Sequence, residues 1–179
     1  MSATFEPAEP SITATETWLR DFVVEHELCP FAKRELNAGR IRTTVTNAAD
    51  TEALLETLID ELMLLENDLS IATTLLVHPC VLSDFVDYNN FLDIADGLLR
   101  EMNLEGVIQI ASFHPDYVFA DAEQNDPANY TNRSPLPLLH LLREEDVARA
   151  IDSHADIHSI PQRNIAYLRA LPAGALPNH

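Results

Sequence analysis

The chain has 179 residues, of which 46% are hydrophobic, and this is the size of a single domain with a core of its own. Its 29 acidic and 11 basic residues give a formal charge of -18 at pH 7. Such a charge repels the phosphates of nucleic acids and of anionic lipids, so we expect neither nucleic acid nor a membrane as a partner.

The N-terminal part of the chain is predicted to be an arm followed by two helices. Residues 1–10 carry two prolines and no periodic pattern, which is typical of a disordered arm. This segment does not resemble a leader peptide and the chain has only two cysteines, which together favour a reducing cytoplasm. Apolar residues at helical spacing predict a helix over about 11–27. A second helix is expected over about 29–39, because Pro30 suits the first helical position.

Strands and helices alternate in the middle of the chain. Residues 41–46 have the alternation of a half-exposed strand, which we expect at a sheet edge. Asp50 is a candidate N-cap for a long helix, and the apolar, β-branched run 71–77 predicts a central strand. Another long helix should open at Ser83, and residues 107–113 should form a further strand.

The last third of the chain is predicted to be irregular and then helical. Residues 115–135 show no periodic pattern, whereas 137–153 and 161–171 are expected to form helices. The segment 172–179 is rich in proline and alanine and is predicted to be a flexible tail.

This order of elements predicts an α/β fold. Strands joined by helical crossovers pair in parallel, so residues 11–171 should form a single domain with a small, mostly parallel sheet of three or four strands covered by helices and a helical C-terminal third. Ligands of such sheets bind beyond the carboxyl ends of the strands. His78 and His114 each follow a predicted strand directly, so both imidazoles are expected at that edge.

Cys29 is the first candidate for chemistry. A thiol at a helix N-terminus, with Lys33 and Arg34 about one turn away, is expected to have a lowered pKa and to act as a nucleophile. The alternative is a small buried thiol that packs under the sheet. His78 and His114 are the candidate acid and base, with the alternative that their imidazoles bind loop carbonyls.

Hydrogen-bonding side chains concentrate in residues 129–135 and in the segment that follows. A guanidinium near a helix N-terminus suits a carboxylate or a phosphate, whereas the alternative is that Arg133 and Asn129 brace a long loop. The candidate ligand-binding residues are Lys33, Asn129, Thr131, Asn132, Arg133, Ser134, His140, Arg143 and Arg163.

A metal site has weaker support in the sequence. Four side chains with suitable donor atoms are Cys29, His78, Cys80 and His114. His140 and Glu144 have the spacing of one helical face, as do His154 and His158, but the latter two are expected to be exposed where a helix ends. No paired metal-binding motif and no glycine-rich nucleotide loop is present, so we assign no metal ligand and leave the cofactor open.

Five segments of the chain carry a resemblance to a known family: Cys29 to Lys33, Gln109 to Pro115, Asn129 to Pro135, His140 to Glu144 and Ile160 to Ile165. Together they resemble a bacterial domain-of-unknown-function family, number 1415, over most of the chain between Trp18 and Leu171. The resemblance implies a cytoplasmic bacterial protein of one domain. It implies no reaction, substrate or catalytic residue.

The leading functional hypothesis is an enzyme that acts on a small anionic metabolite. Cys29 would be its nucleophile and His114 its acid or base, while Arg133, Arg143 and Arg163 would hold the anion. One alternative is a non-catalytic binding module for a small anion, and another is a metal-dependent hydrolase or a structural metal site. The sequence is compatible with a monomer and with a homodimer.

Overall fold

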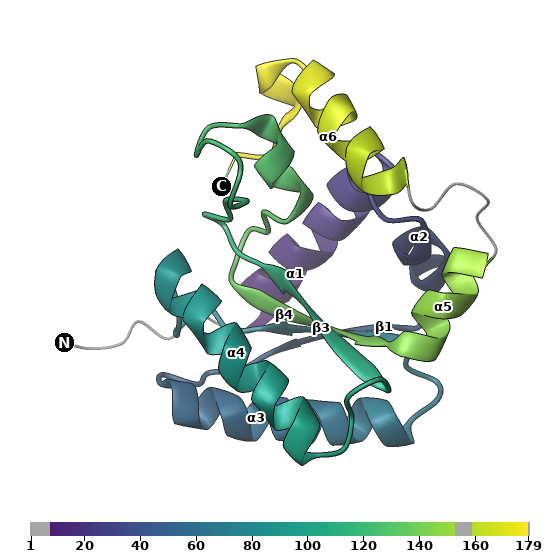
Figure 1. Cartoon of the computed structure of the whole chain (residues 1–179), viewed down its shortest axis with the longest axis vertical. Helices are drawn as coiled ribbons and strands as arrows, with labels where there is room; N and C mark the ends of the chain where they lie inside the picture. The colour runs from purple at the N-terminus through teal and green to yellow at the C-terminus, as the bar shows by residue number, and fades with distance from the viewer. Residues whose placement is uncertain (1–7, 153–158, 179) are drawn as a thin grey trace.

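The computed structural model describes residues 8–152 and 159–178, and these form helices around one four-stranded sheet (Figure 1). The strands are β1 (Ile41–Val45), β2 (Thr73–Val77), β3 (Ile108–Phe113) and β4 (Leu138–Arg143). Their order across the sheet is β1-β2-β4-β3. β1 and β2 are parallel, whereas β4 is antiparallel to both of its neighbours.

The sheet is therefore mostly antiparallel, and the prediction of a mostly parallel sheet is wrong. The predicted helix over 137–153 is also wrong, because residues 138–143 form β4 and the helix begins only at Glu144. The segment Leu-Leu-His-Leu-Leu-Arg is apolar on both faces, and such a short run fits a buried strand and a buried helix equally well. The mixed α/β class and the number of strands are confirmed.

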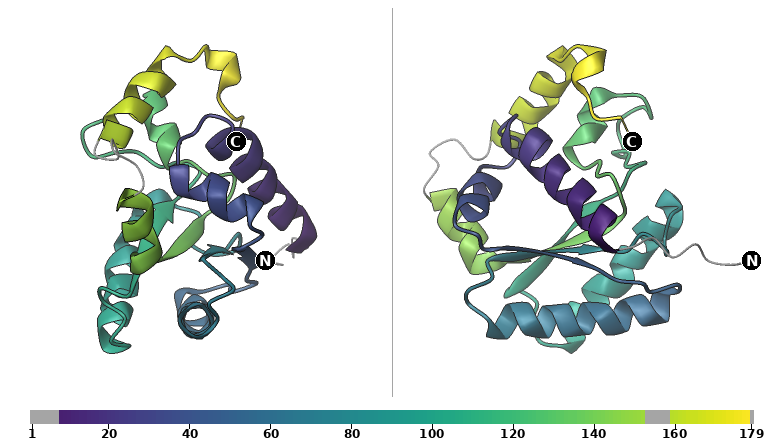
Figure 2. Two further views of the ribbon diagram at one scale, coloured as in Figure 1. Left: turned by 90° about the vertical axis from the view of Figure 1, so that its right-hand side faces the viewer. Right: turned by 180° about the vertical axis from the view of Figure 1, so that it is seen from behind.

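The helices cover both faces of the sheet. They are α1 (Ala8–Trp18), a π-helix (Leu19–Val24), α2 (Pro30–Asn37), α3 (Thr51–Asn67), α4 (Phe85–Glu101), a 3-10 helix (Pro127–Thr131), α5 (Glu144–Asp152), α6 (Ile160–Ala170) and a 3-10 turn (Ala173–Ala175). Figure 2 shows α3 on one side of the sheet and α1 on the other. Among the described residues, no helix combines the length and apolar character that crossing a bilayer requires.

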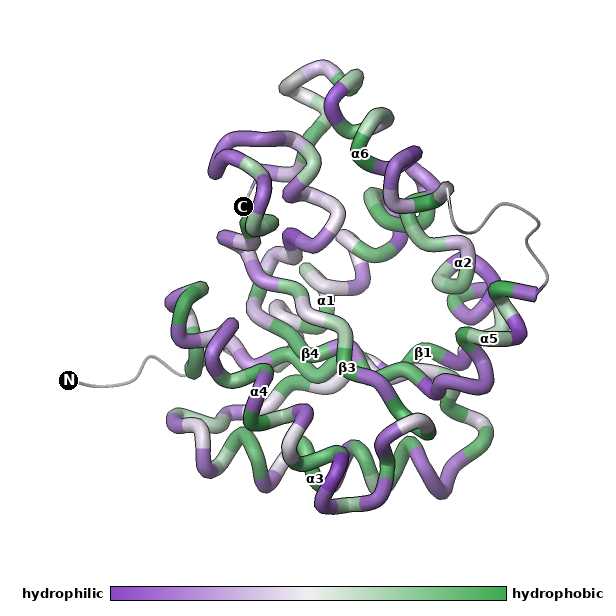
Figure 3. Tube along the Cα trace, in the orientation of Figure 1, coloured by the Kyte–Doolittle hydropathy of each residue, from purple (hydrophilic) through white to green (hydrophobic). Residues whose placement is uncertain are grey.

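Two large hydrophobic cores follow from this layering, and a smaller one contains Phe31, Ala72, Leu142 and Ala150. Leu76, Leu139 and Leu141 point from the sheet toward α3 and α4, where Tyr88 is fully buried. On the other face, Leu75, Val77 and Leu138 pack against Trp18 and Phe22, and Leu168 of α6 completes that core. Figure 3 shows apolar and polar positions alternating turn by turn along α3 and α4, which is the pattern of helices with one buried face.

Local sequence signals agree with most element ends. Asp50 caps α3 by accepting a hydrogen bond from the backbone N–H of Ala53 at 2.9 Å, and Gly39 ends α2 at a φ of 65°. β1 lies at a sheet edge and β2 in the interior, as predicted. The first helix begins at Ala8 and continues as the π-helix, and residues 153–158, with His154 and His158, lie outside the described chain.

Tyr88 of α4 fastens the ends of β3 and β4. Its hydroxyl donates a hydrogen bond to the backbone carbonyl of Leu138 at 2.8 Å. The same oxygen accepts one from the backbone N–H of Phe113 at 2.9 Å. One buried hydroxyl therefore satisfies a polar group on each of two neighbouring strands.

We expect Tyr88→Phe to lower the free energy of unfolding by about 2 kcal/mol, because it leaves two buried backbone groups without their partner. Urea denaturation at pH 7 measures this change. Tyr117→Phe is the matched control, since its ring packs against Phe119 at 5.1 Å and its hydroxyl has no hydrogen bond within the described residues. A loss below about 0.5 kcal/mol in Tyr88→Phe would contradict the fastening role.

Candidate functional site

The histidines at the carboxyl edge of the sheet are held as structural groups. His78 and His114 follow β2 and β3, which run in the same direction, and their rings lie 5.8 Å and 5.1 Å from that of Tyr88. In His114, Nδ1 accepts from the backbone N–H of Asp116 at 3.0 Å, so Nε2 donates to the carbonyl of Leu82 at 3.2 Å. Both ring nitrogens are thus occupied, and the alternative of an imidazole that binds loop groups describes His114.

His78 is fully buried and neutral. Its Nδ1 lies 3.0 Å from the carbonyl of Val81, to which it donates, while Nε2 has no hydrogen-bond partner among the described residues. Burial lowers the pKa of His78 to about 4, and burial also lowers the pKa of His114. Neither imidazole is a base that faces a thiol, since both pack toward Tyr88 of α4.

Cys29 lies on the opposite face of the sheet, at the N-terminus of α2. It packs in the core that contains Phe31 and Ala72, and its side chain is half-buried. Burial raises the pKa of the Cys29 thiol, and the backbone N–H groups of Ala32 and Phe31 oppose this only in part. The thiol is therefore protonated at neutral pH, which is the opposite of the expected activation.

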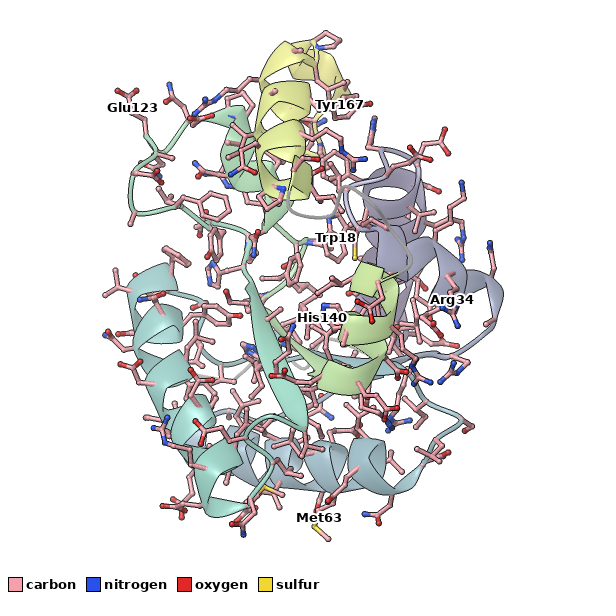
Figure 4. The ribbon with its side chains drawn as sticks, turned by 45° about the vertical axis from the view of Figure 1, so that its right-hand side comes forward. Trp18, Arg34, Met63, Glu123, His140 and Tyr167 are labelled. Atoms are coloured by element: carbon pink, nitrogen blue, oxygen red, sulfur yellow. The ribbon has the colours of Figure 1, made fainter. Side chains whose placement is uncertain are left out.

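An apolar cavity of about 60 Å³ lies between the sheet and the helices on this face. Its walls are Trp18, Leu19, Val23, Cys29, Phe31, Ala32, Ile41, Thr73, Leu75, Phe113 and His140. Figure 4 shows Trp18 and His140 in the interior between the strands and the helices above them. Cys29, Thr73, His140 and Trp18 are the side chains in this wall that carry a reactive or hydrogen-bonding group, and Nε1 of Trp18 has no hydrogen-bond partner among the described residues.

The hydrogen bonds of Thr73 define the tautomer of His140. The Thr73 hydroxyl donates to the carbonyl of Leu141 at 2.6 Å, so it must accept from Nε2 of His140, which lies 2.7 Å away. Nδ1 of His140 is consequently the nitrogen without a proton. Burial lowers the pKa of His140 to about 4, which keeps the ring neutral at pH 7.

A surface groove of about 230 Å³ lies on the outer side of Cys29. It brings together Cys29, Lys33 and Arg163, three of the residues that the sequence singled out. Lys33 forms an ion pair of 3.9 Å with Glu27, and Arg163 donates to the backbone carbonyl of Glu27. The Cys29 side chain lines both the groove and the inner cavity, so it stands at the boundary between them.

The candidate residues of the segment 129–135 form most of their hydrogen bonds within the loop itself. Asn129 is fully buried, and its side chain accepts from the N–H of Phe119 at 3.1 Å and donates to the carbonyl of Glu123 at 2.8 Å. Arg133 donates to the carbonyl of Tyr117 at 3.0 Å, and its guanidinium lies over the ring of Tyr130. The remaining side-chain bonds run from Thr131 to Ala128, from Asn132 to Ser112 and from Ser134 to Leu136. The bracing alternative therefore describes this segment.

Arg143 also has a structural role, at the opposite end of the strands from His78 and His114. Its guanidinium donates to the carbonyls of Leu65, Asp68 and Ile71, which lie at and after the end of α3. It thus satisfies carbonyls that the helix leaves without a partner.

Metal binding gains no support from the arrangement of side chains. Nowhere in the described chain do three or more His, Cys, Asp or Glu side chains gather so that they could hold an ion. Cys80 is exposed, whereas Cys29 packs on the face opposite to His78 and His114. His140 and Glu144 do not share a helical face, because His140 is in β4.

The sequence analysis missed Thr73 and the placement of His140 in the wall of the same cavity as Cys29. The signal for both was a single histidine in the centre of the apolar run that became β4. A lone imidazole in a buried strand needs a hydrogen-bond partner on a neighbouring strand, and Thr73 on β2 is that partner.

The low pKa of His78 predicts acid sensitivity. A histidine with a pKa of about 4 in the folded chain and 6.5 when unfolded stabilises the fold fully above about pH 6.5, and this contribution is lost as the pH falls toward 4. From pH 7 to pH 5 the loss is about 2 kcal/mol for this residue. His78→Asn keeps a donor for Val81 but does not titrate. We expect its unfolding free energy, from urea titrations, to fall by about 2 kcal/mol less than that of the wild type. Equal losses in both proteins would contradict a buried neutral His78.

Comparison with known proteins supports the resemblance found in the motifs. A family model described as "Protein of unknown function (DUF1415)" matches residues 11–177, from the first turns of α1 to the C-terminal segment. No curated protein and no solved structure matches the chain. The family description names no activity, so the arrangement around Cys29 must be interpreted from its own chemistry. Since the match covers nearly all of the described residues, the chain belongs to the DUF1415 family.

Proposed function

We propose that the protein binds a small molecule that has an anionic group beside a short apolar part, with Cys29 at the centre of the site. The observation that carries this proposal is the double position of Cys29, which lines a groove with two cations on one side and an apolar cavity on the other. A ligand that occupies both would place its charge outside and its apolar part inside.

The groove supplies a positive charge that is unusual in this protein. Lys33 and Arg163 face a single carboxylate there, that of Glu27, in a chain with a formal charge of -18. Cationic side chains in a groove attract a carboxylate or phosphate and form charge-assisted hydrogen bonds with it. The proposed ligand is therefore anionic, and the acidic surface elsewhere disfavours a large polyanion.

The inner cavity limits the apolar part of the ligand. Its volume of about 60 Å³ exceeds the roughly 10–15 Å³ that one water needs on the same measure, so it has room for a small group of atoms. Its walls are mostly apolar, and burial of an apolar group there contributes about 25 cal/mol for each Å² removed from water.

Two alkylating reagents of similar size test the charge of the groove. In a Cys80→Ser background, we expect the ratio of iodoacetate to iodoacetamide reaction rates at Cys29 to fall about fivefold in Lys33→Gln/Arg163→Gln, the effect of about 1 kcal/mol of lost attraction. Arg34→Gln is the matched control, because this residue lies next to Lys33 on α2 but does not line the groove. A ratio that stays constant in the double variant would refute an anion-binding groove.

Thiol chemistry is the second candidate function, with His140 rather than His114 as the base. Cys29 and His140 line the same cavity, and Nδ1 of His140 is the nitrogen that can accept a proton. A neutral thiol beside a neutral imidazole becomes reactive when a proton passes from sulfur to nitrogen. Because burial raises the pKa of the Cys29 thiol, the thiol keeps its proton until it attacks, and His140 would take that proton as the new bond to sulfur forms.

The pH dependence of alkylation by iodoacetamide distinguishes the two functions. If His140 accepts the proton, the rate at Cys29 in Cys80→Ser is nearly constant between pH 6 and 8, whereas in Cys80→Ser/His140→Asn it rises about tenfold per pH unit. A tenfold rise per unit in both proteins would leave Cys29 as an ordinary thiol in a binding site and exclude the catalytic pair.

A further inference from the structure

A second cationic pocket lies on the other side of α2 from the Cys29 groove. Four guanidinium groups line it, and its volume is about 320 Å³. They belong to Arg34 of α2, Arg40 before β1, Arg143 at the end of β4 and Arg149 of α5. We call this site the arginine pocket. It is separate from the ligand site proposed above, because none of its lining residues lines the groove or the cavity at Cys29.

Two buried carboxylates position these guanidinium groups. Glu35 is 2% exposed, and its two oxygens lie 3.5 Å from Arg34 Nε and 3.3 Å from Arg40 Nη1. Asp146 is 8% exposed, and it forms ion pairs with Arg149 and with Nε of Arg143 at 3.9 Å. Each carboxylate therefore holds a pair of arginines.

The pocket retains a surplus of positive charge after these pairs are counted. Four arginines stand against Glu35 and Asp146, and Glu145 is the third carboxylate at the pocket. The surplus is unexpected in a protein that has only 11 basic residues against 29 acidic ones. Four arginines against three carboxylates leave one net positive charge, and the guanidinium groups of Arg34 and Arg149 are exposed, so the pocket attracts an anion.

The four arginines differ in the exposure of their side chains, and Arg40, at 33%, lies between the buried Arg143 and the two exposed ones. Arg143 lies at the base of the pocket and is held in place, because its guanidinium also donates hydrogen bonds to the carbonyls after α3. Arg34 and Arg149 are 68% and 60% exposed at their side chains, so their guanidinium groups lie at the mouth of the pocket. α2 and α5 lie side by side, with Arg34 at the surface near α5 (Figure 4). The two exposed arginines therefore face solvent from neighbouring helices.

We propose that the arginine pocket binds a small, multiply charged anion of the phosphate class, such as the pyrophosphate or phosphate group of a small molecule. Planar guanidinium groups form paired hydrogen bonds with phosphate oxygens, and a phosphate group has enough oxygens to contact several arginines. The charge of -18 on the whole chain disfavours a nucleic acid or an anionic membrane, so the ligand is a small molecule.

Calorimetric titration of the full chain with pyrophosphate and with inorganic phosphate, at constant ionic strength, tests this proposal. We expect saturable binding to the wild type, and a dissociation constant for pyrophosphate at least about tenfold higher in Arg34→Gln/Arg149→Gln. These two residues are chosen because their exposed side chains can be replaced without opening the core, which circular dichroism checks. Arg143 is left unchanged because it binds the end of α3.

The matched control is Arg20→Gln/Arg100→Gln, which removes two positive charges from exposed arginines that line neither the arginine pocket nor the site at Cys29. It must bind pyrophosphate as the wild type does, and this separates a loss at the arginine pocket from a general effect of the net charge. Absence of saturable binding in the wild type would overturn the proposal, and the arginines would then serve only to fasten α2 and α5. An equal loss in both double variants, or tighter binding of a single-stranded oligonucleotide than of pyrophosphate, would also overturn it.

Discussion

The hydrogen bonds of β4 hold the sheet together, because β4 pairs with β2 along one side and with β3 along the other. Its alternate residues enter different cores, with Leu139 and Leu141 facing α3 and α4 and Leu138 facing the opposite layer. The same alternation turns His140 toward the cavity at Cys29, and the end of the strand carries Arg143 into the arginine pocket. The positions of both candidate sites thus depend on the register of one six-residue strand.

Elements with a single buried face could be predicted from the sequence, and β4 could not. The repeat of leucines in α3 and the alternation in β1 each identify one structure, and Asp50 and Gly39 mark ends that the structure confirms. A strand buried on both faces loses the twofold pattern by which strands are recognised. Without β4, the order of the other strands and helices implied parallel pairing, so one missed strand changed the predicted topology of the whole sheet.

In the candidate site too, features set by neighbouring residues could be predicted, whereas features that depend on the tertiary structure could not. The sequence placed Cys29 at the start of a helix and named Lys33 and Arg163, although 130 positions separate the latter two. The sequence alone could not show which histidine lines the same cavity as Cys29, because that depends on the face of the sheet that each residue occupies. The predicted lowering of the Cys29 pKa by the helix N-terminus was wrong, since burial of the thiol raises this pKa by more than the backbone N–H groups lower it. Arg133 and Asn129 looked like ligand-binding residues because a long loop and a binding site use the same polar side chains.

The number of residues in the π-helix of residues 19–24 determines how the first helical segment faces the cavity at Cys29. Trp18, Leu19 and Val23, all in or next to this wide turn, form part of the cavity wall. An α-helix turns by about 100° for each residue, so the insertion or deletion of one residue here would rotate α1 relative to α2 by that angle and take these side chains out of the wall. Length changes during evolution should therefore not be tolerated in this short stretch of helix.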